Sequence, residues 1–404
     1  MDDDNINNLL KRGVSEIIIE SELISLLEGN KPLRLKMGFD PSAPDLHVGH
    51  AVGLRKLRQL QDMGHQVVVV VGDWTAQIGD PSGQSATRPM LTAQQVNENA
   101  ETYLNQFYKI VDRNKTETRR QSEWFGSFSL ENVIDLTSRF TVAQFLARDD
   151  FAKRFKSNQP IAITELLYPL LQAYDSVAIE SDVEFGGMDQ KFNLLVGRDL
   201  QQMKGQRPQN RMLVPLLMGT DGVQKMSKSL GNYIGISEPP NDMYGKTMSL
   251  PDCMIIPYLE NLTDLPEDEL AQMRHVIKEK SGNPMELKKR LASELVSQFH
   301  DSQAARTAEV YFEKTVQRGD MPDDIPAFNL PSKSALAVKR LSDILVESNL
   351  AKSTSDARRV INQKGVKINN EAVTENMSAS SLSIGDVIQF GRRRAVKITG
   401  ADAL

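Results

Sequence analysis

The sequence lacks several features that mark particular classes of protein. Its 404 residues contain one cysteine, Cys253, which excludes an internal disulfide and a cysteine-built metal site. No apolar run reaches the length needed to span a membrane. There is no internal repeat and no low-complexity segment. The composition, 40% hydrophobic and 25% charged, is typical of a soluble globular protein with two to four domains.

The charge of the chain is unevenly distributed. The start, Met1-Asp2-Asp3-Asp4, is acidic and lacks the basic and apolar stretches of an address sequence, so we expect a cytoplasmic protein. Residues 338–404 contain 11 Lys and Arg against 7 Asp and Glu, a net charge of +4. The whole chain carries −5, so residues 1–337 carry −9. A basic tail suggests a polyanionic partner, but charge by itself favours a solvated basic face.

Residues 33–71 have the pattern of a strand, a helix and a second strand. Residues 33–38 indicate the first strand, and residues 50–63 place apolar side chains at helical spacing before Gly64, a natural helix end. Residues 67–71 are five consecutive valines, typical of a strand that is buried on both faces. The pattern predicts a parallel sheet. Ligands bind at the carboxyl ends of such strands, where the turn-rich segment 72–83 follows.

The rest of the chain predicts further elements and domain boundaries. Residues 92–150 appear helical and interrupt the alternation, and a helix at 164–178 precedes strands near 183–187 and 212–218. The turn at 219–222 leads directly into a lysine-rich loop, so this loop and the loop that follows the strand at 33–38 are expected at one edge of the sheet. Residues 238–330 are mostly helical, with a proline-rich linker at 320–332.

The C-terminal stretch predicts a small domain. A short helix is opened by Ser355 and closed by Gly365, a strand and turn follow at 366–373, and a hairpin joins 384–390 to 395–399 with Arg392–Arg394 at its tip. The fold class is therefore α/β: a Rossmann-like parallel-sheet catalytic domain with a helical insertion, a following α-helical domain and a small α+β domain. The predicted boundaries are 1–232 with an insertion at about 92–163, then 233–330 and 336–404.

Two short motifs carry the chemical information. His47-Val48-Gly49-His50 lies at a predicted helix N-terminus, which attracts phosphate, and Lys225-Met226-Ser227-Lys228-Ser229 follows about 175 residues later. Isolated, the histidines are more often a helix cap or surface residues, and the lysines fit a solvated turn equally well. Together they indicate adenylate-forming chemistry on ATP, with the glycine- and serine-flanked lysine loop mobile and closing over the nucleotide.

With these motifs the chain resembles the tyrosyl-tRNA synthetases, class I aminoacyl-tRNA synthetases, of the bacterial type with a C-terminal RNA-binding domain. The resemblance covers essentially the full length. Besides the two motifs it rests on four ordered segments: Gly38-Phe39-Asp40-Pro41, Ile78-Gly79-Asp80-Pro81-Ser82-Gly83, Tyr168-Pro169-Leu170-Leu171-Gln172-Ala173-Tyr174-Asp175 and Gly186-Gly187-Met188-Asp189-Gln190.

The resemblance implies ATP-dependent activation of L-tyrosine and transfer of the tyrosyl group to tRNA(Tyr). It implies catalytic roles at the phosphates of ATP for His47, His50, Lys225 and Lys228. Groups that contact the phosphates more strongly in the transition state than in the ground state lower the barrier. No side chain is required as a covalent nucleophile, because the substrate carboxylate is one. The positions implied to bind ATP are Gly38, Asp40, Ser42, His47, Gly49, His50, Gly187, Asp189, Lys225, Met226 and Lys228.

The same resemblance implies how tyrosine and tRNA are recognised. Asp175 is expected to accept from the substrate phenol and Tyr168 to contact its ammonium, and phenylalanine would leave the buried carboxylate unpaired. The alternative to a role in substrate binding is that Gln172 and Asp175, three residues apart, only line a polar helix face. The implied tyrosine-binding positions are Tyr168, Gln172, Asp175, Asp80, Gln190 and Lys36. The implied tRNA-binding positions are Arg358, Arg359, Lys364, Lys367, Arg392, Arg393 and Arg394, although each of these could simply be a solvated basic side chain.

One position departs from the family pattern. Many members carry a tyrosine two residues before the glycine of the first motif, as a second partner for the phenol, whereas this chain has Lys36. The resemblance further implies a homodimer built through the insertion, Mg²⁺ accompanying ATP as substrate, and no metal bound by the protein itself.

Two other functions compete with this interpretation. A different nucleotidyltransferase of the same superfamily would also use the histidine motif and a phosphate-binding loop, but would need neither the basic tail nor Asp175. A regulatory RNA-binding protein that had lost activity would be expected to show decayed motifs, whereas these are intact. Tyrosine-dependent exchange of pyrophosphate into ATP distinguishes both from a tyrosyl-tRNA synthetase.

Overall fold

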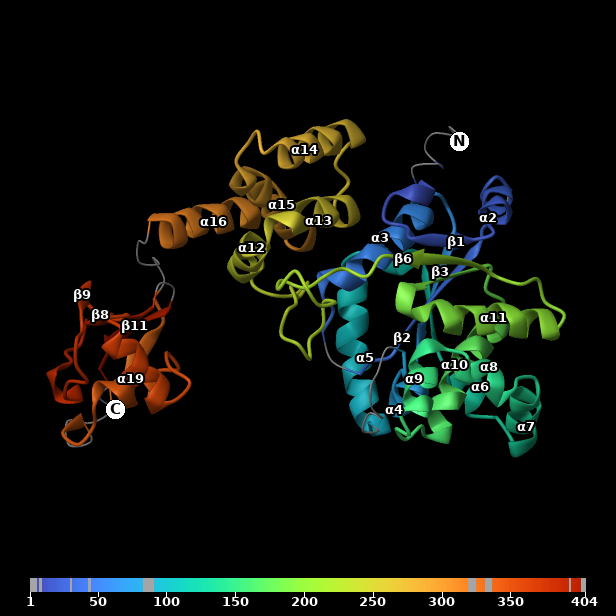
Figure 1. Ribbon diagram of the computed structural model, residues 1–404, viewed down its shortest axis with the longest axis horizontal. Coiled ribbons are helices and arrows are strands. Elements are labelled where there is room, and N and C mark those ends of the chain that lie inside the picture. Colours follow the sequence, from blue (N-terminus) through green and yellow to red (C-terminus); the bar gives the residue numbers. More distant parts are fainter. Residues whose placement is uncertain are drawn as a thin grey trace. The chain divides into compact units, whose positions relative to one another are not determined.

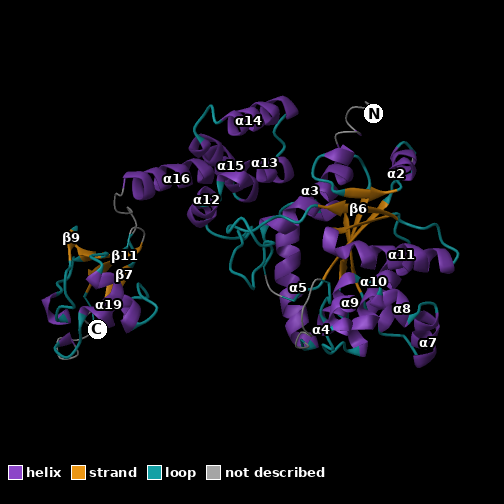
Figure 2. Ribbon diagram, in the orientation of Figure 1, coloured by secondary structure: helices purple, strands orange, loops and turns teal. Residues whose placement is uncertain are grey.

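The computed structural model describes residue 6 and residues 9–29, 31–42, 45–82, 91–318, 325–330, 336–391 and 394–400. The chain divides into two compact units, Met1–Ser302 and Gln303–Leu404. Figure 1 follows the chain through them, and Figure 2 separates helices from strands. Within the described residues, no helix has both the length and the apolar character required to cross a bilayer.

The first unit is built on a six-stranded sheet with the lateral order β1-β6-β5-β2-β3-β4. Neighbouring strands run parallel, except that β1 pairs antiparallel with β6. The order reverses between β2 and β5, and ligands bind beyond the carboxyl ends of strands at such a switch point. The strands are β1 (Glu16–Ile18), β2 (Arg34–Phe39), β3 (Gln66–Val71), β4 (Thr116–Arg120), β5 (Val183–Gly187) and β6 (Asn210–Val214).

Helices pack on both faces of this sheet. The five valines of β3 are fully buried because alternate side chains meet helices on opposite faces. On one face Val68 and Val70 pack with residues of α6 and the end of α10, and on the other Met37 packs against Gly53 of α3. The helices up to β6 are α2 (Glu20–Leu27), α3 (Val48–Asp62), α4 (Thr75–Ile78), α5 (Ala93–Phe107), α6 (Ser122–Phe125), α7 (Leu130–Ser138), α8 (Val142–Leu146), α9 (Asp149–Lys156), α10 (Ile163–Ala178) and α11 (Lys191–Met203).

A run of helices completes the first unit and begins the second. It comprises α12 (Pro240–Met248), α13 (Ile255–Leu262), α14 (Glu267–Glu279), α15 (Pro284–Phe299) and α16 (Ser302–Phe312). The end of α13 is held by Arg12, whose guanidinium donates to carbonyl oxygens that include Glu260 (3.0 Å) and Thr263 (2.7 Å). A cation at the carboxyl end of a helix satisfies carbonyls that have no intrahelical partner.

The second unit contains a five-stranded sheet in the order β7-β11-β10-β8-β9. Its core joins the sheet to two helices through side chains such as Leu345, Ile361 and Ile388, all completely buried. The elements are β7 (Ala327–Asn329), α18 (Leu341–Glu347), α19 (Thr354–Asn362), β8 (Val366–Ile368), β9 (Glu371–Ala372), β10 (Val387–Phe390) and β11 (Arg394–Thr399). The predicted α+β class and its hairpin are confirmed.

The structure corrects four expectations about local structure. The strand expected at 212–218 is β6 and ends at Val214, because Pro215 has no N–H for the ladder. The segment 92–150 is not wholly helical: β4 lies within it and extends the alternation. Its sequence, Thr-Glu-Thr-Arg-Arg, has no apolar residue because it forms an exposed sheet edge whose charges pair with neighbours.

The other two corrections concern the second unit. Ser353, not Ser355, accepts the capping hydrogen bond of α19, from the backbone N–H of Asp356. Part of the expected linker at 320–332 is strand β7, which pairs in parallel with β11. A three-residue edge strand that depends on distant residues gives no local signal.

Candidate active site

The polar loops that carry the sequence motifs converge at the carboxyl edge of the first sheet. The histidine motif follows β2, and the lysine loop follows β6, so the prediction that both lie at one edge is confirmed. The segment after the lysine loop also pairs with the first motif: His47 bridges Gly235, and the N–H of Val48 donates to the carbonyl of Ile234 at 2.9 Å. These backbone contacts hold the two motifs together.

His47 and His50 stand on the first turn of α3. His47 is the N-cap residue, its ring lies 3.9 Å from that of His50 between centroids, and its backbone N–H donates to Nδ1 of His50 at 3.2 Å. Because Nδ1 of His50 accepts, neutral His50 carries its proton on Nε2 and is a donor there. Burial, then the charge of Lys228, lowers the pKa of His50 to about 4.

His47 is kept neutral for related reasons. Burial and then the charges of His50, Lys228 and Lys225 lower the pKa of His47 to about 2. Both rings are therefore neutral near pH 7, and positive charge at the site comes from the lysines. That the lysine charges act on these histidines is a second sign that the two motifs share one site.

Met226 lies beside Gly49, where the ring of His47 leaves no room for a side chain. A Cβ at position 49 would lie 2.9 Å from Nδ1 of His47 and 3.6 Å from Sδ of Met226. Met226 is 2% exposed, and its backbone N–H donates to the carbonyl of Leu217 at 2.9 Å. Its side chain is therefore a buried anchor in an otherwise accessible loop.

The two lysines flank this anchor differently. Lys225 forms an ion pair with Asp189, which lies on the turn after β5 and Gly187. Lys228 is partly buried, and this burial lowers its pKa.

Sequence reasoning missed the residues that shape the lysine loop. Asn232 accepts from the N–H of Ser227 at 2.8 Å and donates to Oδ2 of Asp221 at 2.8 Å. Asp221 also accepts from the N–H groups of Val223 and Gln224. An aspartate opening a glycine-containing turn is a local signal that could have identified the first of these residues; Asn232 is recognisable only in three dimensions.

Asp40 links the first motif to α10. The hydroxyl of Tyr168 donates to Oδ2 of Asp40 at 2.8 Å, and that of Thr75 donates to Oδ1 at 2.7 Å. Gly72 is required here, since a Cβ would lie 2.3 Å from both Asp40 Oδ1 and Thr75 Oγ1. Gly38 lies in β2, and exposed Ser42 donates its N–H to the carbonyl of Asp40 at 2.7 Å.

A second polar group joins the turn after β3 to α11. Gln190 donates to Oδ2 of Asp80 at 2.6 Å, and Asn193 donates to Oε1 of Gln190 at 3.0 Å and to Ser82 at 3.3 Å. The chain thus brings Asp80 and Gln190 together, as expected from two loops at one edge. Asn193 had been missed because it lies inside a regular helix pattern. Gly83 lies outside the described residues.

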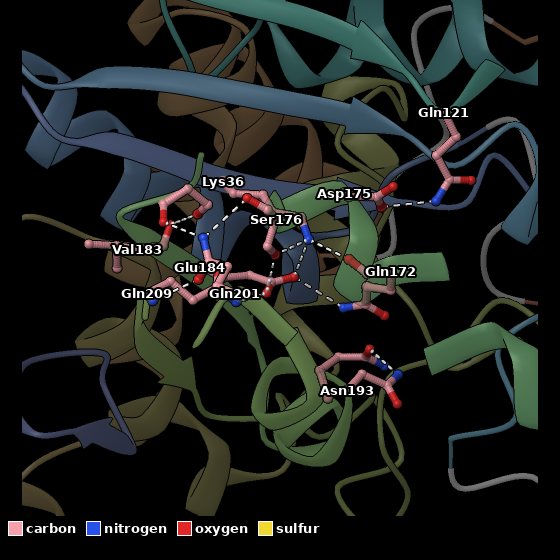
Figure 3. A network of polar contacts seen from close by, with 12 residues as sticks. Lys36, Gln121, Gln172, Asp175, Ser176, Val183, Glu184, Asn193, Gln201 and Gln209 are labelled. Carbon is pink, nitrogen blue, oxygen red and sulfur yellow. Dashed lines mark hydrogen bonds and ion pairs between the residues drawn. The ribbon is translucent and has the colours of Figure 1, made fainter. Parts of the chain in front are cut away.

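Asp175 is a buried carboxylate with two donors (Figure 3 shows one of them, Gln121). It is 2% exposed and accepts from Nε2 of Gln121 at 2.9 Å and from Nε1 of Trp124 at 3.2 Å. Burial raises the pKa of Asp175 to about 7, opposed by the charge of Lys36. Gln121 and Trp124 follow β4, the strand that sequence reasoning did not find.

Lys36 belongs to a network under α10 (Figure 3). Its ammonium donates to Ser176 Oγ at 2.7 Å and to the carbonyl of Gln172 at 2.8 Å, and it pairs with Glu184 at 2.9 Å. An ammonium has three hydrogens, and these acceptors use all of them. The sequence expectation of a tyrosine contact at Lys36 did not anticipate Glu184, its buried partner.

The basic candidates in the second unit lie on several elements. Arg358 and Arg359 are on α19, and Arg359 pairs with Asp356 at 2.6 Å. Lys364 follows that helix, Lys367 is in β8, and Arg394 begins β11 with its guanidinium 4.7 Å from the ring centroid of Phe390. Arg392 and Arg393 lie outside the described residues.

Comparison with known proteins assigns both units. Residues 28–317 match the family of class I tRNA synthetases for tryptophan and tyrosine, and residues 339–380 match the S4 domain. The tyrosine--tRNA ligase of Dehalococcoides mccartyi (strain CBDB1) is 57% identical over 98% of each chain. That of Thermotoga maritima is 48% identical over 98% of this chain and 97% of its own.

Solved structures agree on the fold. A tyrosyl-tRNA synthetase from Archaeoglobus fulgidus complexed with L-tyrosine has a TM-score of 0.62 at 23% identity, covering 76% of this chain and 99% of its own. A C-terminally truncated mitochondrial enzyme from Aspergillus nidulans has a TM-score of 0.63 at 21% identity, covering 76% and 92%. With two motifs meeting at one sheet edge and relatives matched along nearly the whole chain, the protein belongs to the tyrosyl-tRNA synthetases of class I, which activate tyrosine with ATP and charge tRNA with it.

Proposed function

We propose that His47, His50, Lys225 and Lys228 act together on the phosphates of ATP during tyrosine activation. The observation that carries this proposal is the contact of Met226 with Gly49, since it brings the lysine loop against the helix turn that bears both histidines. Neutral His50 offers its Nε2 proton to a phosphate oxygen, and the N-terminus of α3 favours negative charge at the same place. The lysines supply the positive charge.

The chemistry requires stabilisation of charge and not a protein nucleophile. A carboxylate oxygen of tyrosine attacks the α-phosphorus, and the bond to pyrophosphate breaks. A ribose hydroxyl of tRNA then attacks the tyrosyl carbonyl and AMP leaves. Negative charge grows on the departing pyrophosphate in the transition state. Donors that contact it more strongly there than in the ground state lower the barrier.

We propose roles for the remaining positions from the motifs that they share with the tyrosyl-tRNA synthetases. Gly38, Asp40, Ser42, Gly49, Gly187, Asp189 and Met226 surround the nucleotide. Tyr168, Gln172, Asp80 and Gln190 bind the amino-acid end of tyrosine, and Asp175 accepts from its phenol. We propose that Lys36, whose hydrogens are all used by protein acceptors, acts on tyrosine indirectly.

Magnesium enters this proposal with ATP. Across the part of the chain that the structure describes, no three His, Cys, Asp or Glu side chains gather as potential metal ligands. The phosphate oxygens of ATP would hold Mg²⁺ and bring its charge with them. No step above depends on a metal site built by the protein.

We propose that the lysines contribute in the transition state. Lys225→Ala and Lys228→Ala should each cost roughly 3 kcal/mol of barrier, about 10²-fold in the rate of tyrosine-dependent pyrophosphate exchange, with little change in tyrosine binding. Lys278→Ala, at an exposed position of α14, is the matched control. Normal exchange in both loop variants would remove the lysines from the mechanism.

We also propose that the second unit binds tRNA(Tyr) through Arg358, Arg359, Lys364, Lys367 and Arg392–Arg394. Phosphate contacts of this kind give affinity and shape recognition more than sequence readout. A chain ending at residue 318 should retain pyrophosphate exchange and lose most tRNA charging. Equal loss of both activities would contradict a separate RNA-binding role. The proposal places the enzyme in the cytoplasm, where it would meet its tRNA.

The apolar surface of the insertion supports a homodimer. Within α7, residues Leu130, Val133 and Ile134 occupy one face and are 75%, 37% and 58% exposed, while Leu136 faces the core. Val142 of α8 and Phe155 of α9 are also more than half exposed. Clustered apolar side chains of this size are typical of protein contact surfaces. We propose that a second copy of the chain covers them.

A further inference from the structure

Three buried charges lie in register across the centre of the first sheet. Lys36 of β2 stands opposite Glu184 of β5 in the strand register, and Glu184 stands opposite Arg211 of β6, so the three side chains share the face that α10 covers. Of the two neighbouring pairs, Lys36 and Glu184 form an ion pair at 2.9 Å. Their exposed fractions are 0%, 1% and 1%. The row crosses the boundary between β2 and β5, where the strand order reverses. Ionised side chains are this deeply buried only when they are paired.

Glu184 is the acceptor at the centre of this row. Besides Lys36 at 2.9 Å, it accepts from Gln172 Nε2 at 3.2 Å, Ser176 Oγ at 3.2 Å and the amide of Gln209. Lys36 in turn reaches the carbonyl of Gln172 and the hydroxyl of Ser176. The pair thus holds one turn of α10 at two residues four positions apart, and Asp175 lies on the same turn (Figure 3).

The carboxylate determines which way the Gln172 amide faces. An ionised carboxylate only accepts hydrogen bonds, so the group of Gln172 that meets it is the NH₂, and the carbonyl oxygen Oε1 faces away. The α-ammonium of a bound tyrosine only donates hydrogen bonds, so it would need Oε1 of Gln172 as its acceptor. Rotation of the amide by half a turn would place Oε1 against Glu184 and present a donor to a cation. Lys36, 2.9 Å from Glu184, and Arg211, its register neighbour on β6, place positive charge beside this carboxylate and so favour the orientation in which the amide donates to it.

We propose that Lys36 and Glu184 are positioning residues that hold the side-chain oxygen Oε1 of Gln172 toward the α-ammonium of tyrosine. They thereby select for substrates that carry this ammonium group. The inference rests on the proposed role of Gln172 in the tyrosine pocket. It explains why a lysine and a glutamate are buried together against Gln172.

The test uses Glu184→Gln in the full-length enzyme. The substitution keeps size and an acceptor for Lys36 but lets the amides at 172 and 184 pair in either orientation. Two competitive inhibitors of tyrosine-dependent exchange report the result: tyrosinol, which has the phenol and the ammonium, and 3-(4-hydroxyphenyl)propanoate, which has the phenol but no ammonium. We expect tyrosinol to bind about tenfold more weakly and the propanoate to change by less than about twofold, because only tyrosinol uses Oε1. Equal weakening of both inhibitors, or of neither, would overturn the inference.

A double-mutant cycle separates this inference from the proposed function. In a Gln172→Ala background, Glu184→Gln should no longer affect tyrosinol, because it acts through the missing amide. If Gln172→Ala alone leaves tyrosinol binding unchanged, the proposed role of Gln172 fails. If Gln172→Ala weakens tyrosinol and Glu184→Gln does not, only the positioning role fails.

Two further variants guard against loss of the fold. Ser176→Ala removes one donor to Glu184 and one acceptor of Lys36 without changing a charge, and should weaken tyrosinol selectively by a few-fold. Gln206→Leu removes the hydrogen bond from Nε2 of Gln206 to the carbonyl of Val177 at 3.0 Å, so it loosens the same helix without touching Glu184. It should affect both inhibitors alike. If Ser176→Ala behaves like Gln206→Leu, the selective role is wrong.

Discussion

The hydroxyl of Tyr168 donates a hydrogen bond of 2.8 Å to Oδ2 of Asp40. Tyr168 lies on α10, beside Gln172 and Asp175, whereas Asp40 follows β2 and leads into the histidine motif. The bond therefore joins the residues proposed for tyrosine to those proposed for ATP. Burial, then the charge of Asp40, raises the pKa of Tyr168 well above its usual value, so the phenol stays protonated and remains a donor.

Tyr168→Phe should impair the use of both substrates. It leaves Oδ2 of half-buried Asp40 without this donor, and a hydrogen bond to a charged group contributes about 1.5–3 kcal/mol. We expect kcat/KM for tyrosine and for ATP to fall together, by roughly 10- to 100-fold in pyrophosphate exchange. Tyr108→Phe, which removes a hydroxyl bonded to Thr118 at the surface, is the control. A loss confined to one substrate would contradict the link.

Gly49→Ala should displace the histidine motif at the place where Met226 of the lysine loop approaches it. The added Cβ would lie 2.9 Å from Nδ1 of His47, so the ring or the turn must shift. Displacement of catalytic groups by a fraction of an ångström reduces rates, and we expect exchange to slow on the order of 10- to 100-fold with the melting temperature nearly unchanged. Gly245→Ala, in α12 where a Cβ meets nothing within 4 Å, should be nearly neutral. Full activity of the position 49 variant would argue against a tight contact.

Tyrosine use should depend on pH through Asp175. Burial raises its pKa to about 7, with Lys36 and the donors Gln121 and Trp124 opposing the shift and Glu184 adding to it. Below that value the carboxyl is protonated and becomes a poorer acceptor for the phenol, so kcat/KM for tyrosine should rise between pH 6 and pH 8. The histidines titrate near pH 2 and 4 and do not contribute in this window. Asp175→Asn should abolish the transition; its persistence would assign it to another group.

The same carboxyl should affect stability with the opposite trend. A folded-state pKa raised above 3.8 means that the native state holds the proton more tightly than the unfolded chain. The resulting stabilisation is fully present below pH 3.8 and is lost as the pH rises through about 7. The melting temperature of Asp175→Asn relative to that of the unmodified enzyme should therefore increase from pH 5 to pH 8. An unchanged difference would show that Asp175 is not strained by burial.

Ile134→Glu should weaken the proposed dimer. The side chain is 58% exposed on the outward face of α7, so a charge is tolerated in the monomer but would be buried by a second copy. We expect the dimer dissociation constant, measured by sedimentation, to increase at least about tenfold. Met285→Glu, at a 37% exposed position of α15, should leave it unchanged. If Ile134→Glu dimerises normally, another surface forms the interface.

The parallel sheet was predictable where burial on both faces requires a continuous run of apolar residues. The valines of β3 are buried on both faces, and Gly64 ends α3 with a positive φ of 96°, so both signals are local. β4 was not predictable in this way, because an edge strand needs no apolar residue once its charges find partners. That one omission hid Gln121 and Trp124, which follow β4 and supply both hydrogen bonds to Asp175.

Reading along the chain already reveals which chemical groups are available: histidines on a helix turn, lysines on a glycine- and serine-flanked loop, and a basic C-terminal tail. Which of these groups act on one another depends on the fold in three dimensions. Lys36 and Glu184 are 148 residues apart and have no common sequence pattern, yet strand register places their charged groups 2.9 Å apart in the interior. A buried charge is stable only beside a partner of opposite charge, and sheet topology, not distance along the chain, selects that partner.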